Sequence, residues 1–119
     1  MFQAVLKDVV EATDGGVASV VMDLDGIALE SYAKPDAPLD IMTVGIEVSV
    51  VLRSARQAAT ALGAGEATEV AIMTERMTTL VRLITPQYFM ALSLGPGGNV
   101  GKGRYLLRTR APELVGELS

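Results

Sequence analysis

Two carboxylates lie two residues apart in the stretch VVMDLDGIALES, which spans residues 20–31. Asp23 ends an apolar run, Asp25 lies two positions later, and Gly26 comes directly after Asp25. Phosphatases that attack phosphorus with an aspartate carry a similar pattern, Asp-x-Asp-Gly-Thr, after an apolar strand. The first Asp is then the nucleophile and the second its acid/base partner, so the stretch raises the hypothesis of an enzyme.

The rest of the chain favours a simpler interpretation of this stretch. Ile27 stands where those phosphatases have Thr, and beyond Glu75 the remaining carboxylate side chains are Glu113 and Glu117, both in the expected final helix, whereas those phosphatases hold magnesium with a further pair of carboxylates. A second apolar run follows the turn directly, whereas a parallel sheet needs a crossover helix there. We therefore expect a hairpin turn that uses Asp and Gly for backbone geometry. The sequence predicts no catalytic residue, no metal site, no cofactor and no enzyme.

A second candidate is the stretch GPGGNVGK at residues 95–102. A phosphate-binding loop reads GxxxxGK followed by Ser or Thr. Here Pro96 occupies the position of the first Gly, and Gly103 the position of the hydroxyl residue. A weaker alternative remains, in which the helix start and Lys102 hold an anion. The favoured interpretation is a loop in which Asn99 caps the last helix and Gly103 packs closely on the sheet.

Composition narrows the classes of protein that remain. The 119 residues suit one domain, 1–119, with a single core. The chain has no histidine and no cysteine, which excludes histidine-dependent catalysis and disulfides, and makes the cytoplasm the expected location. No run of about 18 apolar residues indicates a membrane span. The net charge of −4, with four bases expected on a solvated face of the last helix, argues against a nucleic-acid partner.

Periodicity and turn residues predict the elements that must position any site. Apolar spacing indicates a first helix, and Val-rich runs bounded by Gly, Asp and Pro indicate strands. The predicted helices are 1–13, 40–62 and 99–118, the last bent by Pro112, and the predicted strands are 17–22, 27–33, 68–74, 77–84 and 88–94. The order αββαβββα with short hairpin connections predicts an α+β fold, with an antiparallel sheet layered with helices.

The segment 40–62 is the most informative element. Its first half alternates as a strand would, but its length, its lack of proline and its continuation into SARQAATALG favour a helix. Apolar residues run most of the way round it, which predicts burial on two sides. One expected face carries Ile41, Val44, Val48, Val51 and Ala55, and the other Met42, Ile46, Val50 and Leu52. A symmetric dimer would bury both faces, whereas the alternative is a thick core helix in a monomer.

The chain resembles the roadblock/dynein light chain family along nearly its whole length. The resemblance rests on the Asp-x-Asp-Gly turn, on the long Ala/Val-rich helix ending in RQAATALG, and on GNVGKGRYLLR at the start of the last helix. The markers in the last stretch are Gly98, Asn99, Gly101, Arg104 and Arg108. The resemblance implies a profilin-like fold with a five-stranded antiparallel sheet sandwiched by helices. It also implies dimerisation through the long second helix and the third strand.

The resemblance further implies what the surfaces do. The expected dimer interface consists of Ile41, Val44, Val48, Val51, Ala55, Val70 and Ile72. Bacterial members of the family often regulate small Ras-like GTPases, and one group stimulates GTP hydrolysis without donating an arginine. A non-enzymatic homodimer that binds such a GTPase through its paired helices is therefore expected. The expected contacts, placed by helical spacing, are Glu47, Arg53, Ser54 and Gln57. The alternative is a scaffold subunit that is indifferent to nucleotide state.

Overall fold

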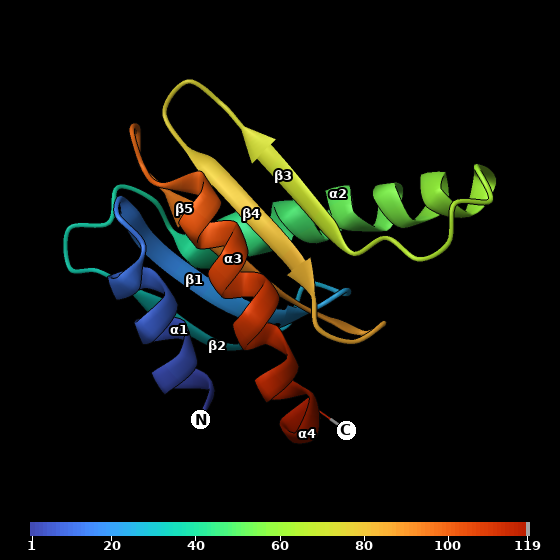
Figure 1. The fold of residues 1–119 in the computed structure, drawn as a ribbon, viewed down its shortest axis with the longest axis horizontal. Coiled ribbons are helices and arrows are strands. Elements are labelled where there is room, and N and C mark those ends of the chain that lie inside the picture. The colour runs from blue at the N-terminus through green and yellow to red at the C-terminus, as the bar shows by residue number, and fades with distance from the viewer. Residues whose placement is uncertain (119) are drawn as a thin grey trace.

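The computed structural model describes residues 1–118 and places the elements in the predicted order (Figure 1). They are α1 (Phe2–Ala12), β1 (Gly16–Asp23), β2 (Ala28–Ala33), α2 (Ile41–Ala61), β3 (Glu69–Met73), β4 (Thr78–Leu83), β5 (Tyr88–Leu94), α3 (Val100–Arg110), a 3₁₀ turn (Ala111–Leu114) and α4 (Val115–Leu118). Each strand, and each of the first two helices, begins and ends within one residue of its prediction. The α+β prediction is confirmed.

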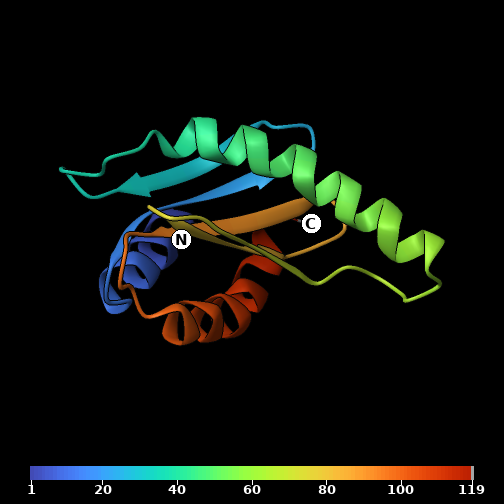
Figure 2. The ribbon, with the colours of Figure 1, turned by 90° about the horizontal axis from the view of Figure 1, so that it is seen from above.

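The five strands form one antiparallel sheet in the order β2-β1-β5-β4-β3. The helix α2 lies on one face of the sheet, and α1 and α3 lie on the other (Figure 2). Because both faces are covered, the central strand β5 is buried from Phe89 to Leu94 and is mostly apolar on both faces instead of alternating. Phe89 and Ala91 point to the α2 side, and Met90, Leu92 and Leu94 to the α1–α3 side.

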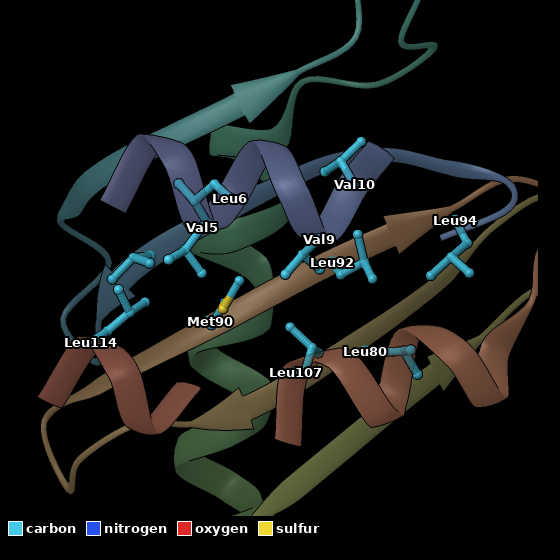
Figure 3. Close-up of a cluster of buried hydrophobic side chains, with 11 residues drawn as sticks. Val5, Leu6, Val9, Val10, Leu80, Met90, Leu92, Leu94, Leu107 and Leu114 are labelled. Atoms are coloured by element: carbon cyan, nitrogen blue, oxygen red, sulfur yellow. The ribbon is translucent and has the colours of Figure 1, made fainter. Parts of the chain in front are cut away.

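Each face of the sheet has its own core. On the α1–α3 side, Val5, Leu6, Val9 and Val10 recur at helical spacing on α1 and pack onto the sheet with Leu107 (Figure 3). The α2-side core consists of Ala18, Val20, Met22, Leu24, Ile41, Val48, Leu52, Val81, Phe89 and Ala91. Full burial of one such large side chain contributes roughly 1.5–3 kcal/mol, so the helices are fixed to the sheet mainly by these two cores.

The turn between α1 and β1 touches the loop between β5 and α3. Gly15 has a φ of +82°, and its carbonyl accepts a hydrogen bond of 2.8 Å from the backbone N–H of Gly95. The backbone N–H of Asn99 donates to the Asp14 carbonyl, also at 2.8 Å. A Cβ on Gly15 would lie only 2.5 Å from the Cα of Gly98. The two loops therefore meet backbone to backbone, which a side chain at position 15 would prevent.

The last helix is broken where proline predicts a break. The helix α3 ends at Arg110, Pro112 lies in the 3₁₀ turn, and α4 resumes at Val115. Because Ala111 and Leu114 in the turn are buried, the break keeps the end of the chain packed against the α1–α3 core.

The two edges of the sheet differ. At the β2 edge, the backbone N–H of Ser31 donates to the side-chain carboxylate of Glu30. The side-chain amide of Gln3, oriented with its nitrogen toward β2, donates to the Ser31 carbonyl at 3.0 Å. The register of β2 also shifts opposite Val21 and Met22. At the other edge, β3 pairs with β4 on one side, and no side chain within residues 1–118 bonds to the backbone of β3. Unpaired strand edges attract further strands, so β3 is the edge open to pairing.

Candidate functional site

The Asp-Leu-Asp-Gly stretch forms the hairpin turn between β1 and β2. Asp23 Oδ1 accepts hydrogen bonds from the backbone N–H groups of Asp25 and Ile27, each at 2.9 Å. The Asp23 N–H donates in turn to the Ile27 carbonyl at 2.9 Å, and Gly26 takes the required positive φ of +87°. The carboxylate that would attack phosphorus thus holds the turn together. In the described part of the chain, no three carboxylate, histidine or cysteine side chains are grouped to hold a metal ion.

Substitution of Asp23 separates the structural from the catalytic hypothesis. Asp23→Ala removes the acceptor of two backbone N–H groups, so we expect it to lower the free energy of unfolding by about 1–2 kcal/mol. Asp23→Asn keeps a side-chain oxygen at the same place, so it is expected to lose less than half as much. Urea denaturation measures both. Equal stability of Asp23→Ala and wild type would contradict the turn role. Magnesium-dependent phosphomonoester hydrolysis that Asp23→Asn abolishes would restore the enzyme hypothesis.

The loop before α3 has the predicted structural roles. Asn99 Oδ1 accepts a hydrogen bond of 3.0 Å from the backbone N–H of Lys102, which confirms the cap. A Cβ on Gly103 would lie 3.1 Å from side-chain atoms of Leu80 and Leu92, which confirms the close packing on the sheet. A hollow of about 270 Å³ lies between this loop and the β3–β4 turn. These contacts give Asn99 and Gly103 structural roles in the start of α3.

The helix α2 begins at a capped end and packs one face on the sheet. Asp40 accepts hydrogen bonds from the backbone N–H of Met42 and the hydroxyl of Thr43, each at 3.1 Å. The buried positions are Ile41, Gly45, Val48, Ser49 and Leu52. A Cβ on Gly45 would lie 2.6 Å from the end of the Met22 side chain, so glycine lets the helix approach the strand. No helix within residues 1–118 is long and apolar enough to cross a bilayer.

The predicted division of α2 into two faces was wrong in part. Leu52, assigned to the face away from Val48, is fully buried beside Val48 in the α2-side core. Ile41 and Val48 are also buried there, which leaves them little surface for a partner chain. Helical spacing puts positions 41, 45, 48 and 52 on one stripe, so it groups Leu52 with Val48, and the assignment of Leu52 to the other face misapplied that spacing.

Four large apolar side chains of α2 remain exposed after the helix has packed. Met42 is 40%, Ile46 49%, Val50 50% and Val51 40% exposed. The helix therefore does expose apolar surface, as expected, but the residues that expose it are not divided between two faces in the predicted way. Contiguous exposed apolar surface marks an interaction site more often than isolated exposed residues do.

An apolar groove of about 280 Å³ runs between α2 and the strands β3 and β4. It is lined by Thr43, Val44, Glu47, Val48, Val51, Ile72, Met77 and Thr79. We call it the α2–β3 groove. It brings together Val44, Val51 and Ile72 of the predicted interface, and it borders the open edge of β3. Val70 and Ala55 are half-buried, Val70 packing against the α2-side core. The groove contains one charged side chain, Glu47.

The predicted polar contacts lie on the outer side of α2, but one of them is engaged within the protomer. Glu47, Ser54 and Gln57 are exposed. Arg53 Nη1 donates to the Leu24 carbonyl in the β1–β2 turn. Sequence reasoning missed Arg56, whose Nη1 donates to the Pro86 carbonyl at 2.8 Å. Both arginines border a shallow hollow of about 500 Å³ that also includes Gln57, Thr60 and Ala61.

The strand β3 is held in place by an ion-pair cluster. Glu69 lies 2.7 Å from the guanidinium of Arg104 on α3 and 4.0 Å from that of Arg82 on β4. The close pair is partly buried, which makes it stronger than a fully solvated one. Arg104 is one of the markers on which the family resemblance rests. This ion pair gives Arg104 a structural role, since it links α3 to β3, the strand that borders the groove.

Comparison with known proteins gave structural matches. No family model matches the sequence, and no curated protein does. MglC from Myxococcus xanthus is 38% identical over 98% of both chains, with a TM-score of 0.71. A roadblock/LC7 domain from Streptomyces avermitilis is 14% identical, covers 97% of this chain and 95% of its own, and has a TM-score of 0.85. The gliding protein MglB from Thermus thermophilus is 20% identical, covers 98% and 89%, and has a TM-score of 0.86.

Proposed function

Because this chain belongs to the roadblock/LC7 family, with MglC as a relative, we propose that it is a non-enzymatic homodimer that regulates a small Ras-like GTPase. In this proposal residues 1–119 act as one roadblock-type domain. The dimer pairs the two copies of α2, and the paired helices bind the GTPase. The observation that carries the proposal is the apolar surface of α2, which stays exposed after the helix has packed on its own sheet.

The α2–β3 groove supports the dimer half of the proposal. Val44, Val51 and Ile72 line it, and the adjacent strand β3 has an open edge. A second copy related by a two-fold axis would fill both grooves and pair both open edges at once. Ile41 and Val48 then support the interface from beneath, since they are buried in the protomer, while Ala55 and Val70 lie at its border.

The outer side of α2 supports the partner half of the proposal. Glu47, Ser54 and Gln57 are exposed beside the apolar side chains, which gives the mixed surface typical of a regulated contact. Arg53 is bonded to the β1–β2 turn, so it serves the partner contact by holding the turn against α2. The non-enzymatic part rests on Asp23, whose carboxylate oxygen is used by the turn.

Capture of the host's Ras-like GTPase tests the proposal. The immobilised protein is presented with that GTPase loaded with either GDP or a non-hydrolysable GTP analogue. A regulator that reads the switch regions is expected to capture one state at least tenfold more than the other, because it must bind the two states with different affinity. Equal capture of both states would favour the scaffold alternative. Absence of capture in both states would defeat the regulator.

A further inference from the structure

We propose that the contact with the partner is made by an apolar patch on the side of α2 next to the β1–β2 turn, and that it selects a partner surface with apolar side chains flanked by lysine or arginine. The patch consists of Ile27, Met42, Ile46 and Val50, and we call it the turn-side patch. The inference rests on the proposed function, since it names the contact surface and the chemistry of the same partner.

The four side chains are brought together by helical spacing and by the turn. Met42, Ile46 and Val50 follow one another at intervals of four, so they lie on one side of the helix. A Cβ on Gly26 would lie 3.9 Å from Ile46 Cγ1, which places the turn directly beside this stripe. Ile27 follows Gly26 and is 63% exposed. The turn that carries Ile27 therefore borders the stripe formed by Met42, Ile46 and Val50.

The turn is held against the helix and does not have to be ordered on binding. Arg53 Nη1 donates to the Leu24 carbonyl, and Leu24 itself is buried in the α2-side core. Asp23 fixes the turn from within through its two backbone bonds. A patch that is already in position avoids the entropy cost of arranging it, which favours binding.

The turn-side patch is separate from the α2–β3 groove. The groove is lined by Val44 and Val51 on α2, whereas Met42, Ile46 and Val50 are not among the residues that line it. Formation of a dimer through the groove would therefore leave the turn-side patch uncovered. An apolar surface that the proposed dimer does not bury needs another occupant.

Charge indicates the chemistry of that occupant. Residues 23–53, which contain the turn and the part of α2 that carries the patch, hold six carboxylates against Lys34 and Arg53, a net −4, equal to the net charge of the whole chain. Asp25 precedes Gly26 in the turn, and Asp40 caps the helix beside Met42. A partner with basic residues around its apolar side chains is steered to such a surface, whereas the same patch of a second copy is repelled.

Binding of the GTPase by matched variants tests the inference. Calorimetry uses the full chain and the host's Ras-like GTPase in the nucleotide state that is captured better. Ile46→Ser removes apolar surface at an exposed position, so it should weaken binding about tenfold or more without unfolding the protein. Asp25→Lys reverses a rim charge, so it should weaken binding at low salt and much less at high salt. The control is Val115→Ser on α4, 41% exposed and far along the chain, which should bind like wild type.

A peptide pair keeps this inference distinguishable from the proposed function. The probes are a short amphipathic Leu/Lys helix and a Leu/Glu helix of the same length. If the GTPase binds wild type but Ile46→Ser and Asp25→Lys bind equally well, the patch is wrong and the function stands. If the GTPase does not bind, the function fails, and the peptides decide about the patch. Preference for the Leu/Lys peptide that Ile46→Ser abolishes would sustain the patch, and equal or absent binding of both peptides would overturn it.

Discussion

Val51→Glu is expected to convert the protein from a dimer to a monomer of about 12.5 kDa. Val51 is 40% exposed and lines the apolar α2–β3 groove, where a partner chain would cover it. A glutamate there places an unpaired carboxylate in an apolar interface, at a cost of about 3 kcal/mol or more. Two-fold symmetry repeats the cost in the second copy, so the Kd of the dimer should rise by roughly four orders of magnitude.

Light scattering at micromolar concentration measures this mass, and Val115→Glu is the matched control. Val115 is 41% exposed, but it lies on α4 and is not part of the groove, so Val115→Glu should keep twice the chain mass. A dimeric Val51→Glu protein would contradict the interface, as would a monomeric wild type. Val48→Glu is a poor test, because Val48 is buried in the protomer core and its replacement would unfold the chain.

Gly15→Ala is expected to cost about 3 kcal/mol of stability and to lower Tm by roughly 10 °C. Two effects add. An alanine at the φ of +82° costs about 1–2 kcal/mol in backbone strain. Its Cβ would also lie 2.5 Å from the Cα of Gly98, which the backbone can relieve only by separating the two loops. The hydrogen bond from the Gly95 N–H to the Gly15 carbonyl would then be lost or lengthened.

Gly97→Ala isolates the first effect, the backbone strain. Gly97 has a similar φ of +76°, but no atom lies within 4 Å of a Cβ built on it. Its replacement should therefore cost only the strain, and thermal unfolding at one fixed protein concentration compares the two variants. If the two substitutions cost the same, the contact between the loops contributes nothing. If Gly15→Ala is as stable as wild type, the positive φ at this position is not required.

The order of the elements could be predicted because the signals for it are local. The Asp-Gly turn of β1 and β2, the cap at Asn99 and the break at Pro112 each depend on residues within a few positions of one another. The β-branched residues at the start of α2 favour a strand, and its apolar and polar residues alternate there. The length of the segment and its helix-favouring second half nevertheless predict a helix. Local rules decide such features before any tertiary contact is known.

The parts of the site that sequence reasoning missed depend on distant pairs. Leu52 is a different case, since helical spacing alone groups it with Val48 one turn away, and its assignment to the other face misapplied that spacing. Arg53 was expected to be free, but its partner Leu24 lies 29 residues away, and the partner of Arg56 lies 30 away. The bond between Arg104 and Glu69 joins residues 35 apart. Only the fold brings these pairs within hydrogen-bonding distance, so no local sequence pattern predicts them.

The unequal edges of the sheet also bear on how many copies could join in the proposed assembly. At β2 both backbone groups of Ser31 have side-chain partners, while β3 is unpaired on its outer side. In the proposed dimer, joining two chains through β3 would use up the open edge of each and leave β2 at either end, partly covered by the side chains of Glu30 and Gln3. A third copy would then meet only this partly covered strand, which disfavours growth into a fibre.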